Sequence, residues 1–104
     1  MDSIGNFSKL TELVMSSNHV SGAIPEGMGN LLSIQNIDLS SNQLSGVIPT
    51  SITKLTQLRY LRLDSNNLDG TLPESFSSLQ SLQSFDLGEN MLAGTIPASW
   101  STML

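Results

Sequence analysis

The four prolines of the chain recur at one constant spacing. Two further columns keep the same period, with a glycine shortly before each proline and an asparagine before each glycine. The prolines are Pro25, Pro49, Pro73 and Pro97, the glycines are Gly22, Gly46, Gly70 and Gly94, and the asparagines are Asn18, Asn42, Asn66 and Asn90. A fixed period in three columns indicates one structural unit built four times.

The period divides the chain into repeats. We predict a single array, residues 1–104, with repeats at 7–30, 31–54, 55–78 and 79–102. Residues 1–6 match the end of a preceding repeat, and residues 103–104 match the start of a following one. The pattern starts and ends within a repeat, as expected for a piece of a longer parent protein.

Apolar residues occupy positions 1, 4, 7, 9, 14, 18 and 22 of each repeat. Positions 7 and 9 alternate with polar neighbours, which is the pattern of a half-buried strand. Leu61 and Leu63 are therefore expected to point inward, and Tyr60, Arg62 and Asp64 outward. One such coil cannot bury its apolar side chains alone, so stability requires stacking. We predict a parallel sheet of four or five strands, one per repeat, with little regular helix.

The polar columns predict how each coil turns. An inward asparagine can bond the free backbone groups of a turn through both its amide donors and its oxygen. Glycine suits a backbone that needs positive φ or a close approach. Proline fixes φ, removes an N–H and ends the preceding extended stretch.

These columns resemble the plant-type leucine-rich repeat. The third repeat reads Leu58-x-x-Leu61-x-Leu63-x-x-Asn66-x-Leu68-x-Gly70-x-Leu72-Pro73, and the second carries Leu44-Ser45-Gly46-Val47-Ile48-Pro49. The resemblance implies an α/β-type repeat solenoid, a right-handed coil with a parallel concave β-sheet. It also implies a second short sheet near the Ser-Gly-x-Ile segment. Members usually carry paired-cysteine caps and more repeats, whereas this chain has no cysteine and so no caps.

Composition excludes several functions. The net charge is -5 and only 12% of residues are charged, which argues against nucleic acid as a partner. Without cysteine there is neither a disulfide nor a thiolate metal site. No apolar stretch approaches the roughly 18 residues of a membrane span, and residues 1–3 lack the features of a signal peptide. We expect no cofactor, no metal site and no membrane span within this chain.

The outward strand positions are the surface that the resemblance assigns to recognition. The candidate ligand-binding residues are Glu12, Val14, Asn36, Asp38, Arg59, Tyr60, Arg62, Asp64 and Asp86. Arg62 is flanked in its column by Asp38 and Asp86, which suits either a ligand anchor or an ion-pair ladder of at most ~1 kcal/mol per exposed pair. With Glu89 included, the strip has five acids against two arginines, which favours a cationic or polar partner.

The remaining polar residues suggest no catalysis. His19 has no partner at a spacing that would make it a metal ligand or general base. The pairs Ser16–Ser17 and Ser40–Ser41 are expected to be solvated turn residues. Trp100 belongs to an apolar column, so we expect it in the core or covering the end of the stack. Asn6-Phe7-Ser8 fits the N-glycosylation pattern, which operates only in a secretory pathway.

The sequence therefore predicts a non-enzymatic recognition module. By resemblance it is a ligand- or protein-binding piece of a plant receptor ectodomain, with a signalling or defence role on the extracellular side of the plasma membrane. Expected partners are a protein or peptide ligand and a co-receptor. One alternative is an extracellular inhibitor that resembles the polygalacturonase-inhibiting proteins. Another is the ectodomain of a receptor kinase whose kinase domain lies outside this chain.

Overall fold

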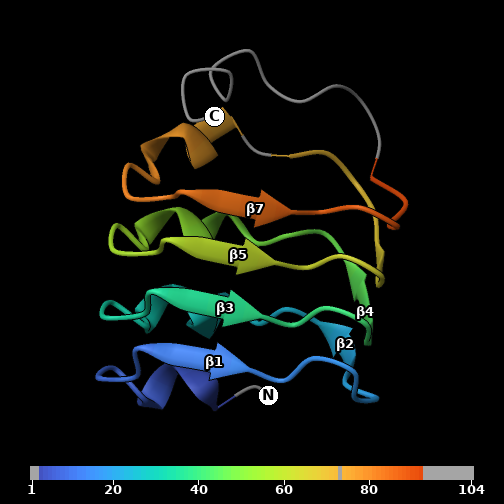
Figure 1. Cartoon of the computed structure of the whole chain (residues 1–104), viewed down its shortest axis with the longest axis horizontal. Helices are drawn as coiled ribbons and strands as arrows, with labels where there is room; N and C mark the ends of the chain where they lie inside the picture. Colours follow the sequence, from blue (N-terminus) through green and yellow to red (C-terminus); the bar gives the residue numbers. More distant parts are fainter. Residues whose placement is uncertain (1–2, 73, 93–104) are drawn as a thin grey trace.

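The computed structural model describes residues 3–72 and 74–92. Successive coils stack on one another, and each contributes one strand to a four-stranded sheet (Figure 1). The strands of this concave sheet are β1 (Glu12–Val14), β3 (Asn36–Asp38), β5 (Tyr60–Arg62) and β7 (Ser84–Asp86). A second, lateral sheet contains β2 (Ser21–Ala23), β4 (Gln43–Gly46) and β6 (Asn67–Leu68). The 3-10 helices are η1 (Ile4–Asn6), η2 (Glu26–Asn30), η3 (Thr50–Lys54) and η4 (Glu74–Ser78).

The concave sheet is parallel and follows the sequence period. Asn36 pairs with Glu12 on one side and with Tyr60 on the other, and each step is 24 residues. The ladder continues past the strand ends, because the Leu39 N–H donates to the Arg62 carbonyl at 2.9 Å. The predicted parallel sheet with one strand per repeat is confirmed for the described residues.

The lateral sheet is also parallel but has a different register. Ser21 pairs with Gln43, and Ser45 pairs with Asn67, so that each step is 22 residues. The sheet lies where the resemblance implied a second one, which is confirmed. Paired residues on adjacent strands are thus two residues closer in sequence than in the concave sheet. The sequence period alone does not predict this difference.

A single apolar core fills the interior between the two sheets and the helical turns. Leu61 and Leu63 are fully buried, as their inward positions predicted, and Tyr60 and Arg62 face outward. The other buried apolar residues are Leu13, Ile24, Met28, Leu31, Ile34, Ile37, Leu39, Leu44, Ile48, Ile52, Leu55, Leu58, Leu68, Phe76, Leu79 and Leu82. Most come from coils that have a neighbour on each side, because stacking completes the burial of each coil.

Two columns of the coil have left-handed backbone. Gly22, Gly46 and Gly70 have φ of 86°, 77° and 76°, the conformation that the glycine column predicted. A second column contains no glycine: Ser17, Ser41, Ser65 and Glu89 have φ of 57°, 56°, 58° and 51°. Sequence reasoning missed this column because serine and glutamate do not mark left-handed backbone.

One glycine outside the periodic column is needed for close stacking. A Cβ at Gly29 would lie 2.5 Å from the carbonyl oxygen of Ser51, so η2 could not approach η3 with any larger residue there. The Ser51 hydroxyl donates to the Glu26 carbonyl at 2.9 Å and ties the two helical turns together.

Within the described ranges every helix is of the 3-10 type, which confirms the prediction of little regular helix. None of the described helices is long and apolar enough to cross a membrane. The predictions for Pro73, Gly94, Pro97, Trp100 and the partial repeat 103–104 concern positions outside the described residues.

Candidate recognition surface

The outward side chains of the concave sheet lie in two registered rows. The first row is Glu12, Asn36, Tyr60 and Ser84, and the second is Val14, Asp38, Arg62 and Asp86. Neighbouring residues in a row lie on adjacent strands, about 4.8 Å apart. The structure therefore brings seven of the nine candidate ligand-binding residues into these rows, and the other two, Arg59 and Asp64, flank β5.

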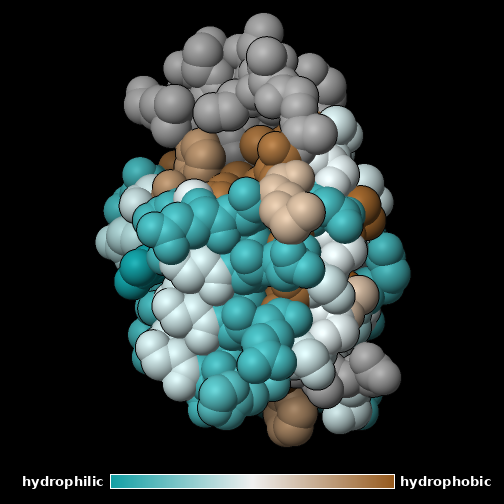
Figure 2. Space-filling view, turned by 90° about the vertical axis from the view of Figure 1, so that its right-hand side faces the viewer, coloured by the Kyte–Doolittle hydropathy of each residue, from teal (hydrophilic) through white to brown (hydrophobic). Residues whose placement is uncertain are grey.

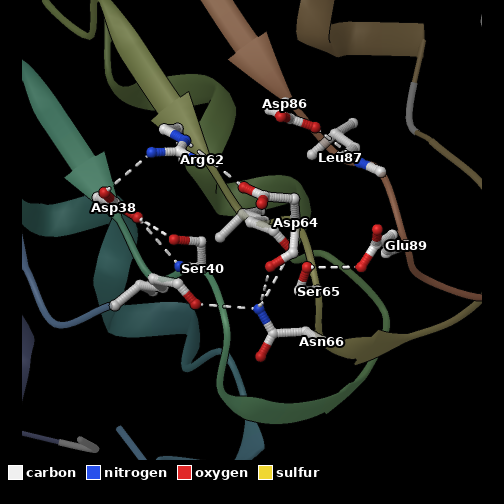
Figure 3. A network of polar contacts seen from close by, with 12 residues as sticks. Asp38, Ser40, Arg62, Asp64, Ser65, Asn66, Asp86, Leu87 and Glu89 are labelled. Carbon is white, nitrogen blue, oxygen red and sulfur yellow. Dashed lines mark hydrogen bonds and ion pairs between the residues drawn. The ribbon is translucent and has the colours of Figure 1, made fainter. Parts of the chain in front are cut away.

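Arg62 is the centre of a charged network (Figure 3). Its Nη1 lies 3.6 Å from Asp38 Oδ2, and its Nε lies 3.5 Å from Asp64 Oδ1. No ion pair joins Arg62 to Asp86 in the described part of the chain. Asp86 Oδ1 instead accepts the Gly88 N–H at 3.0 Å, within its own turn. Arg62 thus pairs with one acid of its column and with Asp64, which the ladder interpretation did not include.

Asp38 is held by the turn that follows it. Its Oδ1 accepts the Ser40 N–H at 3.1 Å and the Ser40 hydroxyl at 2.6 Å. Ser40 is buried, so the interpretation of Ser40 as a solvated turn residue is wrong. The physical reason is that the Asp38 carboxylate satisfies this hydroxyl inside the turn. Asp38 is therefore a fixed acceptor rather than a freely moving side chain.

Asp64 has an unsatisfied oxygen. Its Oδ1 is buried and receives no hydrogen bond within the described residues, and its polar neighbour is the Arg62 Nε at 3.5 Å. Only 16% of the Asp64 side chain is exposed, against 51% of Arg62. The protein encloses this oxygen, so its nearest compensating charge is the Arg62 guanidinium.

Tyr60 provides an open aromatic surface beside this network. The residue is 43% exposed, and its hydroxyl donates to Gln83 Oε1 at 3.2 Å. This bond orients the ring and leaves its outer face accessible. Gln83 was not among the predicted site residues. The available signal was its place one period after Arg59, in the same outward column and directly before β7.

Three other features of the surface are the Asn36–Glu12 pair, Arg59 and Val14. The Asn36 side-chain amide donates to Glu12 Oε2 at 3.3 Å. Arg59 is exposed, and the ion pairs found among the described residues do not include it. Val14 is also exposed and adds an apolar element at the end of the second row. The surface therefore combines carboxylates, guanidinium groups, an aromatic ring and an aliphatic side chain.

The asparagine column lies beneath this surface. The Asn66 Nδ2 donates to the carbonyls of Leu39 at 2.9 Å, Leu63 at 3.1 Å and Asp64 at 3.2 Å. Its Oδ1 accepts the Leu44 N–H at 3.0 Å. Asn42 and Asn90 repeat this arrangement, whereas Asn18 has only its two local carbonyl bonds. The column joins each coil to the preceding one.

His19 and Asn6 lie outside the strands of the concave sheet. His19 is exposed and its Nδ1 lies 3.4 Å from Gln43 Nε2. In the described part of the chain, no group of three or more His, Cys, Asp or Glu side chains is placed to hold a metal ion. Asn6 is exposed at the end of η1.

The side that carries the lateral sheet has a different character (Figure 2). Hydrophilic groups dominate its centre, and hydrophobic groups gather in its upper part, with others at its right and lower edges. Its β-strands present small or uncharged side chains, among them Ser21, Ala23, Gln43 and Asn67. The concave sheet is therefore the surface with charged and aromatic groups held in register.

Comparison with known families identifies the repeat. A sequence model described as leucine-rich repeat matches residues 8–68, and a second leucine-rich-repeat model matches residues 81–103. A comparison with curated protein sequences gave no match.

Solved structures show the same architecture. The plant peptide hormone receptor RGFR1, in complex with RGF2, is 38% identical with a TM-score of 0.95 over 98% of this chain. The BIR2 ectodomain from Arabidopsis thaliana is 38% identical with a TM-score of 0.91 over 96% of this chain. A plant ice-binding protein is 32% identical with a TM-score of 0.94 over 99% of this chain.

All three neighbours are longer than this chain, which spans 16% of RGFR1, 53% of the BIR2 structure and 34% of the ice-binding protein. The matched models cover most of the sequence, and the solved structures share its stacked coils. The chain therefore belongs to the leucine-rich-repeat family, with repeats of the kind found in plant receptor ectodomains.

Proposed function

We propose that this chain is a recognition module of a plant receptor ectodomain and binds a protein or peptide ligand through its concave sheet. The main support is that Tyr60 and Arg62 both lie on the outward face of β5, one of the two inner strands, and both are substantially exposed. Tyrosine and arginine are the residue types that most often anchor protein interfaces. The inward residues around them repeat from coil to coil, whereas the outward ones differ, as a specific binding surface requires.

The charge of this surface defines the partner further. Glu12, Asp38, Asp64, Asp86 and Glu89 lie on or beside the strip, against Arg59 and Arg62. Arg62 is already shared between two carboxylates, Asp38 and Asp64. A ligand with lysine or arginine side chains would meet an excess of carboxylates. Electrostatic complementarity of this kind raises the association rate and selects among partners.

The neighbours support recognition rather than catalysis, although a fold alone does not define function. RGFR1 is a peptide hormone receptor, and BIR2 was solved as an ectodomain. Ice binding is less favoured, because a repeating lattice would be matched by like side chains in each coil. The outward rows here are mixed. The receptor ectodomain fold is typically non-catalytic, and we propose no enzymatic activity for this chain.

The cellular setting follows from the same proposal. The parent protein would lie on the extracellular side of the plasma membrane, with its signalling segment outside this chain, and would engage a co-receptor. A secreted inhibitor of an extracellular enzyme is the alternative. The parent coding region separates the two: an apolar span downstream of the repeats supports a receptor, kinase motifs beyond it support a receptor kinase, and neither supports the inhibitor.

A binding titration tests the recognition surface. Peptides would be selected from a phage-displayed library on the immobilised chain, and one would be titrated by calorimetry. Tyr60→Ala and Arg62→Ala should each weaken binding by more than about 1 kcal/mol, roughly a fivefold rise in Kd. Gln80→Ala is the matched control, since Gln80 is exposed beyond η4, and should change Kd less than about twofold. If only the control weakens binding, recognition lies off the concave sheet.

A further inference from the structure

The segment Asn6-Phe7-Ser8 combines an acceptor pattern with an exposed position. Within the whole sequence it is the only asparagine followed two residues later by serine or threonine. We infer that Asn6 carries an N-linked glycan, a modification that lies on the side of the coil away from the concave sheet. This inference rests on the secretory route that the proposed function implies.

Asn6 and Ser8 are exposed because of their position in the coil, which is exposed in the following coils as well. Their equivalents in the next coil, Asn30 and Leu32, are exposed too, and so are Lys54 and Thr56 one coil further on. These coils are stacked on both sides. The exposure of Asn6 is therefore a property of its position in the coil and does not depend on its being near one end of the described stack.

The Asn6 amide is also available. Among the described residues its side chain makes no hydrogen bond, and only its backbone N–H is engaged, to the Ser3 carbonyl at 3.1 Å. In contrast, the amides of Asn42 and Asn66 each donate to three carbonyls. The nitrogen that would bond to the sugar is thus not committed to the fold at Asn6. Attaching a glycan there would break no side-chain hydrogen bond found within residues 3–72 and 74–92.

The transfer reaction requires this amide, the Ser8 hydroxyl, a transferase and a sugar donor. A lipid-linked oligosaccharide pyrophosphate, supplied in the secretory pathway, is the co-reactant. Asn6 Nδ2 forms a bond to C1 of the first sugar, while the bond from C1 to the phosphate oxygen breaks. The lipid pyrophosphate leaves with that electron pair, and the amide proton passes to a base of the transferase. The Ser8 hydroxyl provides the recognition group that the acceptor pattern demands.

The location of Asn6 predicts which face the glycan covers. Asn6 ends η1, and the 3-10 helices stack as a layer behind the concave sheet (Figure 1). Gly5 lies against η2, where an added Cβ would be 2.7 Å from the Gly27 carbonyl oxygen and 3.2 Å from Asn30 Nδ2. Asn6 lies one period before Asn30 and η1 packs against η2, so the glycan would lie over the helical turns. It would leave Tyr60 and Arg62 accessible, so glycosylation and concave recognition are compatible.

The test uses the full chain, expressed behind a cleavable signal peptide in plant cells. Intact-mass spectrometry should show a mass excess that a peptide-N-glycosidase removes, leaving aspartate in place of Asn6. Asn6→Gln and Ser8→Ala should both abolish the excess, and Ser8→Thr should keep it. Asn67→Gln is the matched control, since Asn67 is exposed but has no serine or threonine two residues later, and it should retain the glycan.

Translation in the presence of microsomes provides a second measurement that does not require secretion. A gel shift lost in Asn6→Gln supports the site, and an unshifted wild-type chain in both systems overturns it. Peptide binding then tests whether the glycan lies away from the concave sheet. The library-selected peptide should bind glycosylated and Asn6→Gln protein with Kd within about twofold, and a fivefold or larger weakening by the glycan would overturn its placement. If the peptide ignores Tyr60→Ala and Arg62→Ala while the glycan is present, the proposed function fails and the glycan site stands.

Discussion

The concave and lateral sheets are built from the same repeats but follow different registers. Strand pairing advances by 24 residues in the concave sheet, as between Asn36 and Tyr60, and by 22 residues in the lateral sheet, as between Ser45 and Asn67. Rows of side chains deduced from the sequence period are therefore correct on the concave sheet only. The sequence period sets the register of the concave sheet, whereas other contacts set the register of the lateral sheet.

The asparagine column supplies those contacts. Asn66 donates to the Leu39 and Leu63 carbonyls, which directly follow the concave strands. Its Oδ1 accepts from Leu44 in β4, 22 residues earlier, which matches the step of the lateral register. The concave sheet depends on alternating inward and outward side chains. The lateral sheet depends in addition on the half-buried Asn66 amide and on left-handed backbone at Gly46.

The largest expected effect concerns the concave sheet. Leu61→Ala should lower the free energy of unfolding by about 2–5 kcal/mol, because Leu61 is fully buried in the middle of β5 and its loss leaves a cavity. Urea denaturation followed by circular dichroism would measure this. Tyr60→Ala, its outward neighbour, should cost less than about 1 kcal/mol. Equal losses for the two variants would contradict the assigned faces of the strand.

The next effect separates the two sheets. Asn66→Ala should cost about 1–3 kcal/mol, since it leaves three carbonyls and the Leu44 N–H with a lost partner. Asn67→Ala, on the exposed neighbour, should stay within about 0.5 kcal/mol.

Hydrogen exchange would sharpen this result. In Asn66→Ala the amide of Leu44 should lose protection, because Asn66 Oδ1 is its acceptor. The amide of Leu39 bonds to the Arg62 carbonyl in the concave ladder and should lose less. Uniform loss at both amides would mean that the two sheets open as one unit and that asparagine does not specifically support the lateral register.

Much of this fold could be predicted from the sequence because its information is periodic. The alternation at Leu61 and Leu63 places one row inward, and a recurrent glycine marks positive φ at Gly46. The two-residue shift of the lateral sheet could not be predicted. It arises from side-chain bonds across coils, such as that from Leu44 to Asn66, and from left-handed backbone at residue types that do not indicate it, such as Ser41.

The candidate site could likewise be predicted only in part. Which residues face outward follows from alternation, but their pairing does not. Arg62 pairs with Asp64 rather than Asp86, because Asp86 bonds the backbone of its own turn at Gly88. Gln83 bonds Tyr60 although the two are 23 residues apart, one residue off the period. Side-chain rotamers and local turn bonds decide such contacts, and the repeat does not encode them.

A smaller effect tests the glycine column of the lateral sheet. Gly46→Ala should cost about 1–2 kcal/mol through its φ of 77° alone, because its new Cβ would meet only the Ala23 Cβ, at 3.8 Å. Gly70→Ala should cost more, since a Cβ there would lie 2.6 Å from Val47 Cγ1. Adding Val47→Ala should remove the difference in a double-mutant cycle. If Gly70→Ala still costs more in the absence of the valine side chain, the Val47 contact is not the cause.

The smallest effect concerns the turn that joins the two sheets. Ser41 has φ of 56°, is exposed, and its N–H donates to the Asp64 carbonyl at 2.9 Å. Left-handed backbone is costly for most residues but tolerated by asparagine, whose side chain can bond locally. Ser41→Asn should therefore raise the free energy of unfolding by about 0.5 kcal/mol while keeping the backbone bond. Ser21→Asn, in the edge strand β2, is the matched control and should be neutral or slightly destabilising, because asparagine is disfavoured in strands. Urea midpoints of the two variants measure the difference. A loss of stability in Ser41→Asn would mean that this turn is held by its cross-coil hydrogen bonds and stores no strain that a better-suited residue could relieve.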